Sequence, residues 1–168
     1  MSSDSITAPA QPTMLVIPPE AGGAVAAFGS VAVFQLEGSH TAGTLCLAFA
    51  ETPPGMGPPP HVHLHDDELF LVLEGELSFL TPTGWVKTTP GTAVYIPRGV
   101  VHSFRNTGTT PSRHWALTSP SGFERFYTKA AEMFASGTAS PTGLQTLARE
   151  HGYEFLPPGA FPPPSTSR

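Results

Sequence analysis

Between residues 13 and 119 the sequence consists of short apolar runs separated by glycine and proline. Runs such as "TLCLAFAE", "ELFLVLEG" and "TAVYIPRG" are rich in β-branched, aromatic and aliphatic residues and have the length of single strands. The 20 prolines and 17 glycines of the chain indicate frequent turns. This pattern predicts an all-β protein, built as a sandwich or a barrel.

One run shows the alternation that is typical of a strand. In "ELFLVL", residues 68–73, the side chains of Glu68, Phe70 and Val72 share one face, and the three leucines share the other. Because both faces are mostly apolar, we expect this strand to be covered on both sides, with Glu68 as the exception.

After residue 120 the apolar period changes to that of an α-helix. Ser121 and Glu124 have the spacing of a capping box ahead of an apolar stripe, and Gly137 ends the pattern. A second helix is expected from Ser140 to Gly152. Because the apolar stripe needs a partner, we expect both short helices to pack on the outside of the β unit.

The 168 residues are enough for a single domain with its own core. We expect a barrel over residues 13–120 and a C-terminal helical extension over residues 121–156. Residues 1–12 and 157–168 are polar or proline-rich, so they are expected to form flexible tails.

Charge and hydropathy exclude two classes of partner. The net charge is -5, and the eight Lys and Arg residues form no basic cluster, so a nucleic-acid partner is not expected. No apolar run reaches the roughly 18 residues of a membrane span, and the N-terminus lacks a basic region followed by an apolar stretch. These features predict a soluble cytoplasmic protein with no membrane partner. The lone Cys46 lies mid-strand and is expected to be a buried, inert thiol.

Histidines and acids gather in "PPPHVHLHDDELFLVLEGE", residues 58–76. His61 and His63 are two positions apart, so in an extended chain both imidazoles leave the same face and can converge on one ion. Glu68 lies an odd number of positions beyond His63 and would point the opposite way on an uninterrupted strand. We therefore expect "LHDD" to turn or bulge, so that Glu68 rejoins the two histidines.

A further polar residue, His102, stands in the apolar run "PGTAVYIPRGVVHSFRN", just after a predicted turn at residues 97–99. It would supply a fourth ligand from a distant strand. Three neutral imidazoles and one carboxylate suit one divalent transition metal ion, namely Fe, Mn, Ni, Co or Zn, with room left for water or substrate.

The spacing of these residues resembles the two motifs of the cupin family. The first motif, G-x5-H-x-H-x4-E-x6-G, is matched at Gly55, His61, His63, Glu68 and Gly75. The second, G-x5-P-x-G-x2-H-x3-N, is matched at Gly91, Pro97, Gly99, His102 and Asn106. The resemblance spans residues 55–106 at motif level and extends loosely over the remaining β region.

This resemblance implies a double-stranded β-helix, the jelly-roll barrel of the cupins, with a single barrel per chain. It implies a metal bound inside the barrel by His61, His63, Glu68 and His102. In overall style, with "ELFLVLEGELSF" and a helix start at "SPSGFERFY", the chain is similar to the small bacterial cupins of the quercetin 2,3-dioxygenase-like type.

Several other polar residues have two interpretations. His65, Asp66 and Asp67 lie in the predicted turn and form either a polar surface loop or, for His65, a group that orients a metal ligand. His114 lies in a strand pattern and either points into the barrel near the metal or is a structural histidine.

The remaining candidates are expected to be exposed or to pack in the core. His40 and His151 are expected to be exposed, and Arg98 belongs to a turn where it is either functional or solvated. Six aromatic residues either line a substrate pocket or pack in the core: Phe70, Phe79, Trp85, Tyr95, Phe104 and Trp115.

Three functions are compatible with the expected barrel and its candidate metal ligands. The first is a quercetinase-like metal-dependent dioxygenase, in which the ion and O2 act on an enolisable or phenolic (flavonol-like) small molecule and Glu68 is the catalytic base. The second is a non-redox cyclase, isomerase, decarboxylase or lyase that uses the ion as a Lewis acid. The third is a small-molecule-binding barrel without turnover.

A homodimer is also expected. An open jelly-roll sheet leaves edge strands, and the apolar segment "TMLVI", residues 13–17, is a strand that would pair with or cross to a second subunit.

Overall fold

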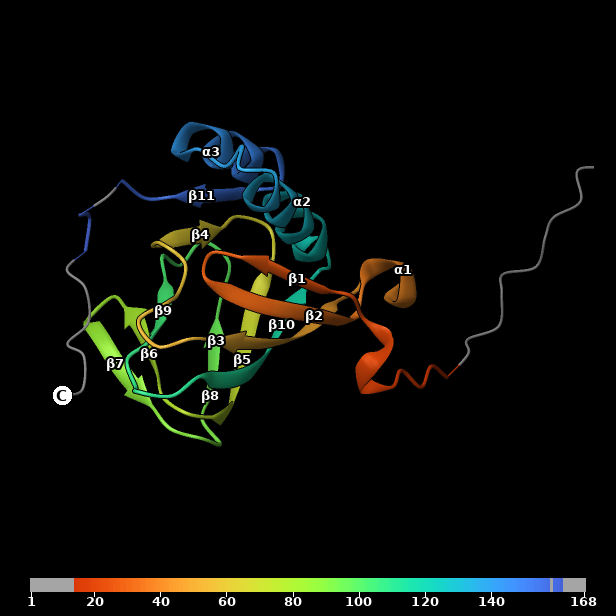
Figure 1. The fold of residues 1–168 in the computed structure, drawn as a ribbon, viewed down its shortest axis with the longest axis horizontal. Coiled ribbons are helices and arrows are strands. Elements are labelled where there is room, and N and C mark those ends of the chain that lie inside the picture. The colour runs from red at the N-terminus through yellow and green to blue at the C-terminus, as the bar shows by residue number, and fades with distance from the viewer. Residues whose placement is uncertain (1–13, 158, 162–168) are drawn as a thin grey trace, which may run out of the picture.

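The computed structural model describes residues 14–157 and 159–161, which form a β-barrel with two helices at one end (Figure 1). A six-stranded sheet has the order β1-β2-β3-β10-β5-β8, and all of its neighbouring strands are antiparallel. Its strands are β1 Ala24–Ala27, β2 Ser30–Leu36, β3 Cys46–Thr52, β5 Asp67–Glu74, β8 Ala93–Ile96 and β10 Ser112–Ser119.

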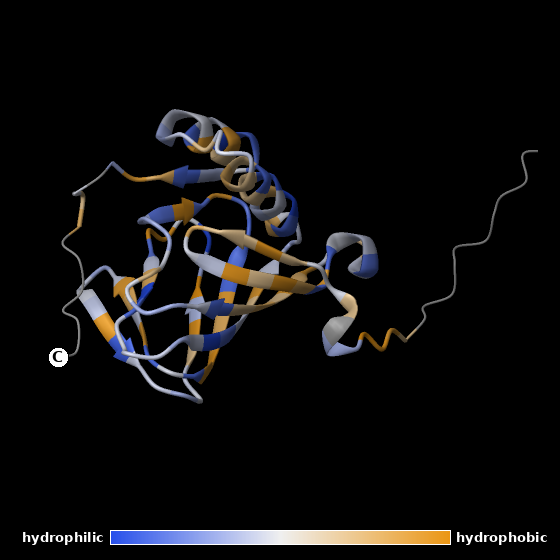
Figure 2. Ribbon diagram, viewed as in Figure 1, coloured by the Kyte–Doolittle hydropathy of each residue, from blue (hydrophilic) through white to orange (hydrophobic). Residues whose placement is uncertain are grey.

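Two smaller sheets complete the barrel. One has the order β7-β6-β9, and the other pairs β11 with β4. Their strands are β4 His61–His63, β6 Leu77–Thr81, β7 Gly84–Thr88, β9 Ser103–Asn106 and β11 Tyr153–Phe155. Buried and less buried residues alternate along strands such as β3 and β10, and apolar residues (orange) occur in strands of all three sheets (Figure 2). This arrangement confirms the all-β class and the double-stranded β-helix.

The register of the large sheet arranges its inward side chains in rows across four strands. One row crosses the barrel wall at the level of β10 residue 114, the next at residue 116 and the third at residue 118. In the strand order β2, β3, β10, β5, the row of residue 114 consists of Ala32, Ala50, His114 and Val72. The row of residue 116 consists of Phe34, Ala48, Ala116 and Phe70. The third holds Cys46, Thr118 and Glu68. Alanines therefore keep much of the interior open.

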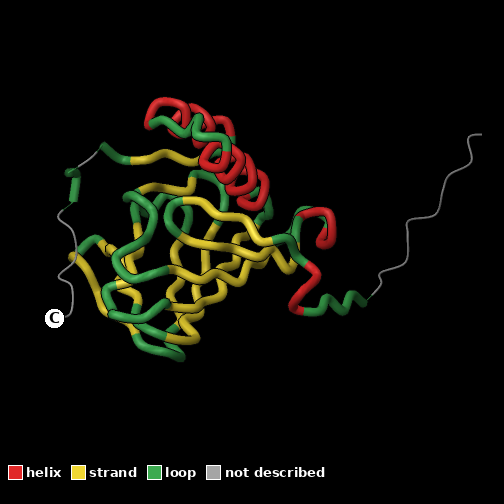
Figure 3. The backbone as a smooth tube through the Cα atoms, in the orientation of Figure 1, coloured by secondary structure: helices red, strands yellow, loops and turns green. Residues whose placement is uncertain are grey.

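Two short helices follow the barrel and lie together at one end of it (Figure 3). They are α2, Phe123–Ala135, and α3, Pro141–Glu150, so the two predicted C-terminal helices are confirmed. Ser140 caps α3 by accepting a hydrogen bond of 3.1 Å from the Gly143 amide.

The start of α2 differs from the prediction. Its N-cap is Gly122 rather than Ser121, and the Glu124 carboxylate instead accepts from the Gly122 amide at 2.7 Å and from the Gly38 amide at 3.2 Å. Glu124 therefore ties α2 to α1, Gly38–Thr41, a short helix that the sequence pattern did not indicate.

Two apolar segments differ from expectation in the single chain. Residues 14–17 form no strand, and Met14 and Val16 are 87% and 85% exposed; a 3-10 turn, Pro19–Ala21, comes before β1. The outer face of β5 is also uncovered in the single chain, since its leucines at 69, 71 and 73 are all exposed. The tail expected at residues 1–12 lies outside the described residues, as does most of the tail expected at 157–168.

Cys46 is 1% exposed, as predicted, and it accepts a hydrogen bond of 3.4 Å from the Thr118 hydroxyl. Burial raises the pKa of its thiol to about 12. No helix in the described part of the chain is long and apolar enough to cross a bilayer.

Candidate metal centre

The fold brings together the four side chains that the sequence singles out. β4 supplies His61 and His63, β5 supplies Glu68, and His102 lies just before β9. His61 and His102 are joined by two backbone hydrogen bonds of 2.9 Å, in which each amide donates to the other's carbonyl. The nitrogen and oxygen atoms that these side chains can offer to a metal all lie within 4.8 Å of one another.

The turn predicted between His63 and Glu68 is present. The chain bends at residues 64 and 65 and re-enters a strand at Asp67, which returns Glu68 to the inside of the barrel. The Gly99 amide donates to the His63 carbonyl at 2.7 Å, so the second motif contacts the first here. Gly99 has a φ of 81°, a conformation that costs glycine little and most other residues more.

Each of the three imidazoles is held by its Nδ1 atom. Nδ1 of His61 bonds the Pro59 carbonyl at 2.8 Å, and Nδ1 of His102 bonds the Val100 carbonyl at 2.9 Å. Nδ1 of His63 bonds Oδ2 of Asp66 at 2.8 Å. Because carbonyl and carboxylate oxygens accept, these contacts assign a proton to Nδ1 in every ring, so that Nε2 is the atom each ring can offer to a metal; Nε2 of His102 also contacts the Glu68 carboxylate.

The arrangement fits a single transition metal ion. Two atoms that each lie about 2.1 Å from one ion are at most about 4.2 Å apart, close to the 4.8 Å spread of the cluster. Nε2 of His102 is 3.0 Å from Oε2 of Glu68, about the separation of two ligands at right angles on such an ion. Nε2 of His63 is buried and has no hydrogen-bond partner within the described ranges, and an ion would satisfy it.

Charge and burial act together on the four groups. Burial alone would raise the pKa of Glu68, but the surrounding imidazoles, His63 and His102 above all, lower it to about 2. Burial lowers the pKa of His61 well below its ordinary value. For His63 the effect of burial is outweighed by Glu68 and Asp66, which raise its pKa. The carboxylate of Glu68 is therefore ionised at neutral pH.

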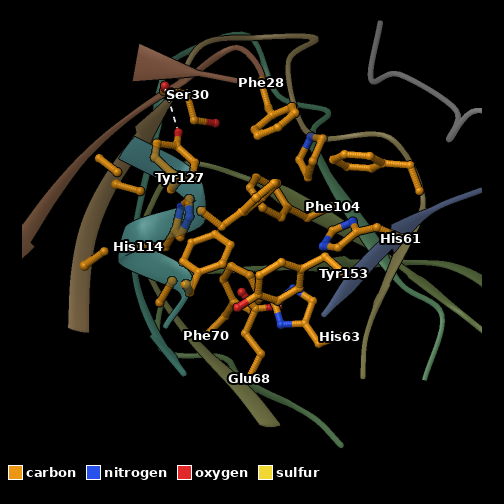
Figure 4. A pocket seen from close by; sticks show the side chains of 18 residues that line it. Phe28, Ser30, His61, His63, Glu68, Phe70, Phe104, His114, Tyr127 and Tyr153 are labelled. Atoms are coloured by element: carbon orange, nitrogen blue, oxygen red, sulfur yellow. Dashed lines mark hydrogen bonds and ion pairs between the residues drawn. The ribbon is translucent and has the colours of Figure 1, made fainter. Parts of the chain in front are cut away.

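An apolar chamber opens beside the cluster (Figure 4). Its volume is about 60 Å³, and Glu68, His61 and His63 line it together with His114. Most of its wall is aromatic or alanine. The aromatic residues that line it are Phe28, Phe70, Phe104, Phe123, Phe126, Tyr127, Tyr153 and Phe155.

A comparison with protein families matches residues 48–116 to the family described as "Cupin_2: Cupin domain". The matched stretch contains His61, His63, Glu68 and His102. This match and the double-stranded β-helix support membership of the cupin superfamily.

Curated proteins also resemble the chain. Germin-like protein 1-3 of Oryza sativa subsp. japonica is 34% identical over 139 residues, which cover 77% of this chain and 60% of that protein. Nectarin-1 of Nicotiana langsdorffii x Nicotiana sanderae is 37% identical over 94 residues, covering 51% of this chain and 41% of that protein. The chain thus spans less than two thirds of these relatives.

The solved structures share the fold. A predicted oxalate decarboxylase from Thermotoga maritima has a TM-score of 0.59 at 20% identity, covering 63% of this chain and 99% of that one. The polyketide cyclase RemF from Streptomyces resistomycificus has a TM-score of 0.55 at 24% identity, covering 64% of this chain and 80% of that one.

Within the matched residues 48–116, Asp66 has a role that the sequence pattern did not predict. Its place in a polar turn favours a surface loop, but it is 5% exposed and its carboxylate accepts a hydrogen bond from Nδ1 of His63. His65, which was considered for this orienting role, is exposed and lies beside Gly152. The one signal in the sequence is that Asp66 is the acid nearest to a histidine ligand.

The neighbouring acid, Asp67, faces the other way. Oδ1 of Asp67 accepts hydrogen bonds of 2.9 Å from the backbone amide and from Nε of Arg98. Oδ2 of Asp67 accepts one of 3.2 Å from Nη2 of Arg98. The hydrogen bonds from Arg98 hold the pKa of Asp67 well below its usual range. Arg98 is thus paired, and the pair joins the turns of the two cupin motifs.

The other candidates separate into interior and exterior residues. Phe70, Phe104 and His114 face the chamber, and Phe79 packs in the core. Tyr95 is 62% exposed, and Trp115 contacts Phe49 on the outer side of the large sheet. Trp85 on β7 is half-buried and is not among the residues that line the chamber. His40 is exposed, as expected, and His151 is half-buried.

Proposed function

We propose that this cupin is a metal-dependent dioxygenase that acts on an enolisable or phenolic small molecule. The observation that carries the proposal is the set of three imidazoles, each oriented through Nδ1, beside an ionised carboxylate in an apolar chamber. His61, His63 and His102 would hold one divalent transition metal ion, with Glu68 as a fourth ligand or poised beside it.

The ion, when bound, would act as a Lewis acid that lowers the pKa of a substrate hydroxyl and orients it for reaction with O2. Glu68 would take the phenol or enol proton, since its carboxylate is ionised and lines the chamber. The aromatic wall would exclude bulk water and favour an apolar gas and an uncharged substrate.

A second function is supported by a different observation. Glu68 and the imidazole of His114 both line the chamber, so two groups that can carry a proton lie on one substrate site. Such a pair would serve a non-redox cyclase, isomerase, decarboxylase or lyase. The printed names of two proteins with the same fold, a polyketide cyclase and a predicted oxalate decarboxylase, belong to this class. Binding without turnover is less supported, because the ligand set is complete.

Oxygen dependence separates the two enzyme classes. The protein, purified without added metal, would be analysed for its metals and then assayed with a panel of flavonols and smaller enolisable compounds, with and without air. We expect O2 consumption matched to product. Equal turnover without O2 would assign the non-redox class, and ligand binding with no product under either condition would contradict both.

Replacing Glu68 by glutamine tests its role as a base. The variant keeps the shape and one oxygen ligand but loses the charge, so we expect metal to be largely retained and turnover to fall by about 10² to 10⁴. Glu74→Gln is the matched control, since Glu74 lies on the same strand but is exposed and pairs with Arg113 at 2.9 Å. Near-normal turnover of metal-loaded Glu68→Gln would remove Glu68 from the mechanism.

The cytoplasmic location of the protein remains a prediction.

A further inference from the structure

His114 lines the chamber two inward rows of the large sheet away from the row that holds Glu68. It lies four positions along β10 from Thr118, and Thr118 pairs with Glu68 on β5. Four residues of strand separate the backbones of residues 114 and 118 by about 13 Å. Figure 4 shows His114 across the pocket from His61. The ring is 1% exposed and lines the chamber, so its neighbours are interior atoms rather than solvent.

The imidazole of His114 lacks the hydrogen bonds that a structural histidine normally makes. Its Nδ1 atom is buried and has no partner in the part of the chain that the structure describes. The ring packs against Phe70 and Phe104, with centroids 5.5 and 5.2 Å apart. Phenylalanine would make the same contacts without leaving a polar atom unpaired, so packing alone does not account for histidine at this position.

Alanines leave free space next to the His114 ring. Ala32 and Ala50 share its row across the sheet, and Ala48 and Ala116 lie in the next row toward the metal centre; all four line the chamber. The chamber volume of about 60 Å³ is well below the roughly 150 Å³ that holds benzene in an engineered cavity. A ligand that extends from the metal centre to His114 must therefore be slim, unless the aromatic wall moves.

We propose that His114 is a second anchor for the substrate, which binds the metal centre through oxygens at one end and donates to or accepts from His114 through a neutral hydroxyl or carbonyl at the other. The part between the two anchors would be a narrow apolar chain or edge lying over Ala48 and Ala116. This inference rests on the proposed function, because the first anchor is the metal site. It narrows the substrate class to elongated molecules with polar groups at both ends.

The state of the ring agrees with a neutral partner. Burial lowers the pKa of His114 to about 4, so the imidazole is uncharged at neutral pH and offers one N–H donor and one acceptor. A carboxylate or ammonium group would have to lose its hydration beside this uncharged ring, whereas a hydroxyl or carbonyl loses much less.

Linear hydroxamic acids provide the test, since their head group chelates divalent metals and their tail is slim. The full-length protein, loaded with Co²⁺, would be titrated by calorimetry with matched pairs of increasing length, each pair differing only in a terminal hydroxyl or methyl. We expect that at one length the hydroxyl member binds about 3- to 10-fold more tightly, the contribution of one hydrogen bond. His114→Phe should abolish this preference, and His114→Gln, which keeps a donor and an acceptor, should restore part of it.

Thr118→Val is the matched control, because Thr118 lies on the same strand and the same inward face but bonds Cys46 instead of facing the chamber. It should leave the preference unchanged. Equal affinity of both members at every length in the unaltered protein would overturn the inference without any variant, while the bound hydroxamates would still support the metal site. A preference that persists in His114→Phe would also overturn it. If no hydroxamate bound to the Co²⁺-loaded protein, the proposed function and this inference would both be wrong.

Discussion

Replacing Asp66 by alanine tests how the metal centre is oriented. The Asp66 carboxylate accepts from Nδ1 of His63 at 2.8 Å, and the two side chains are 6% and 2% exposed, so water cannot readily replace the bond. Loss of such a partner of a histidine ligand typically weakens metal binding by about 10- to 100-fold, or about 1.4 to 2.7 kcal/mol. Asp66→Asn keeps a neutral acceptor, so we expect a smaller loss.

The assay is competition for Zn²⁺ or Co²⁺ against a chelating dye, at a pH where both proteins are folded. Asp67→Ala is the matched control: it removes the adjacent carboxylate, which is bound to Arg98 on the surface. We expect unaltered metal affinity in the control, and thermal unfolding of the metal-free proteins separates metal loss from loss of fold. Equal affinities of Asp66→Ala and the parent, or equal losses in the two alanine variants, would refute the reasoning.

Three further predictions concern other parts of the molecule. His102→Ala should lower metal occupancy, measured by elemental analysis, with a smaller effect on the melting temperature because the barrel has its own apolar core; full occupancy would contradict the assignment. Cys46 should resist a water-soluble thiol reagent at pH 8 until urea unfolds the chain, because the pKa of its buried thiol is raised to about 12. The protonated thiol stabilises the fold fully below the unfolded pKa of about 8.5, and this stabilisation declines as the pH rises toward 12. We propose that the chain forms a homodimer through the outer face of the large sheet, where Leu69 and Leu71 are 38% and 39% exposed beside Trp115. Light scattering should report a dimer for the parent and a monomer for Leu71→Asp, and a parent that is monomeric at all concentrations would disprove it.

The candidate metal cluster could be predicted because its geometry is local. His61 and His63 share a face through the period of a strand, and the polar turn after His63 reverses the direction of Glu68. Only His102 needs a long-range contact, and its spacing from Pro97 and Gly99 in the motif made it identifiable. The two helices were predictable for the same reason, since a period of 3.6 residues is a property of a short segment.

Burial by distant elements could not be predicted in the same way. Asp66 and Asp67 are identical and adjacent in the sequence, yet one is 5% exposed and the other pairs with Arg98 at the surface. Which of them points inward depends on the direction of the chain as it leaves β4. The exposure of the outer leucines of β5 could not be predicted for a related reason. A run that is apolar on both faces predicts that other elements cover both faces, but in the single chain only one face is covered.

The C-terminal extension contacts the candidate metal site, although its sequence pattern separates it from the barrel. β4 has only three residues, too few to be stable alone, and β11 pairs with it at Tyr153 opposite His63. The rings of Phe123 and Tyr153 lie against the His63 imidazole, with centroids 5.7 and 4.6 Å away. The extension thus both supports the strand that carries two ligands and closes the chamber beside them. Under the proposed function, a substrate would have to fit the aromatic side chains of the extension as well as the interior of the barrel, so that specificity could change in this segment while the four candidate ligands stay the same.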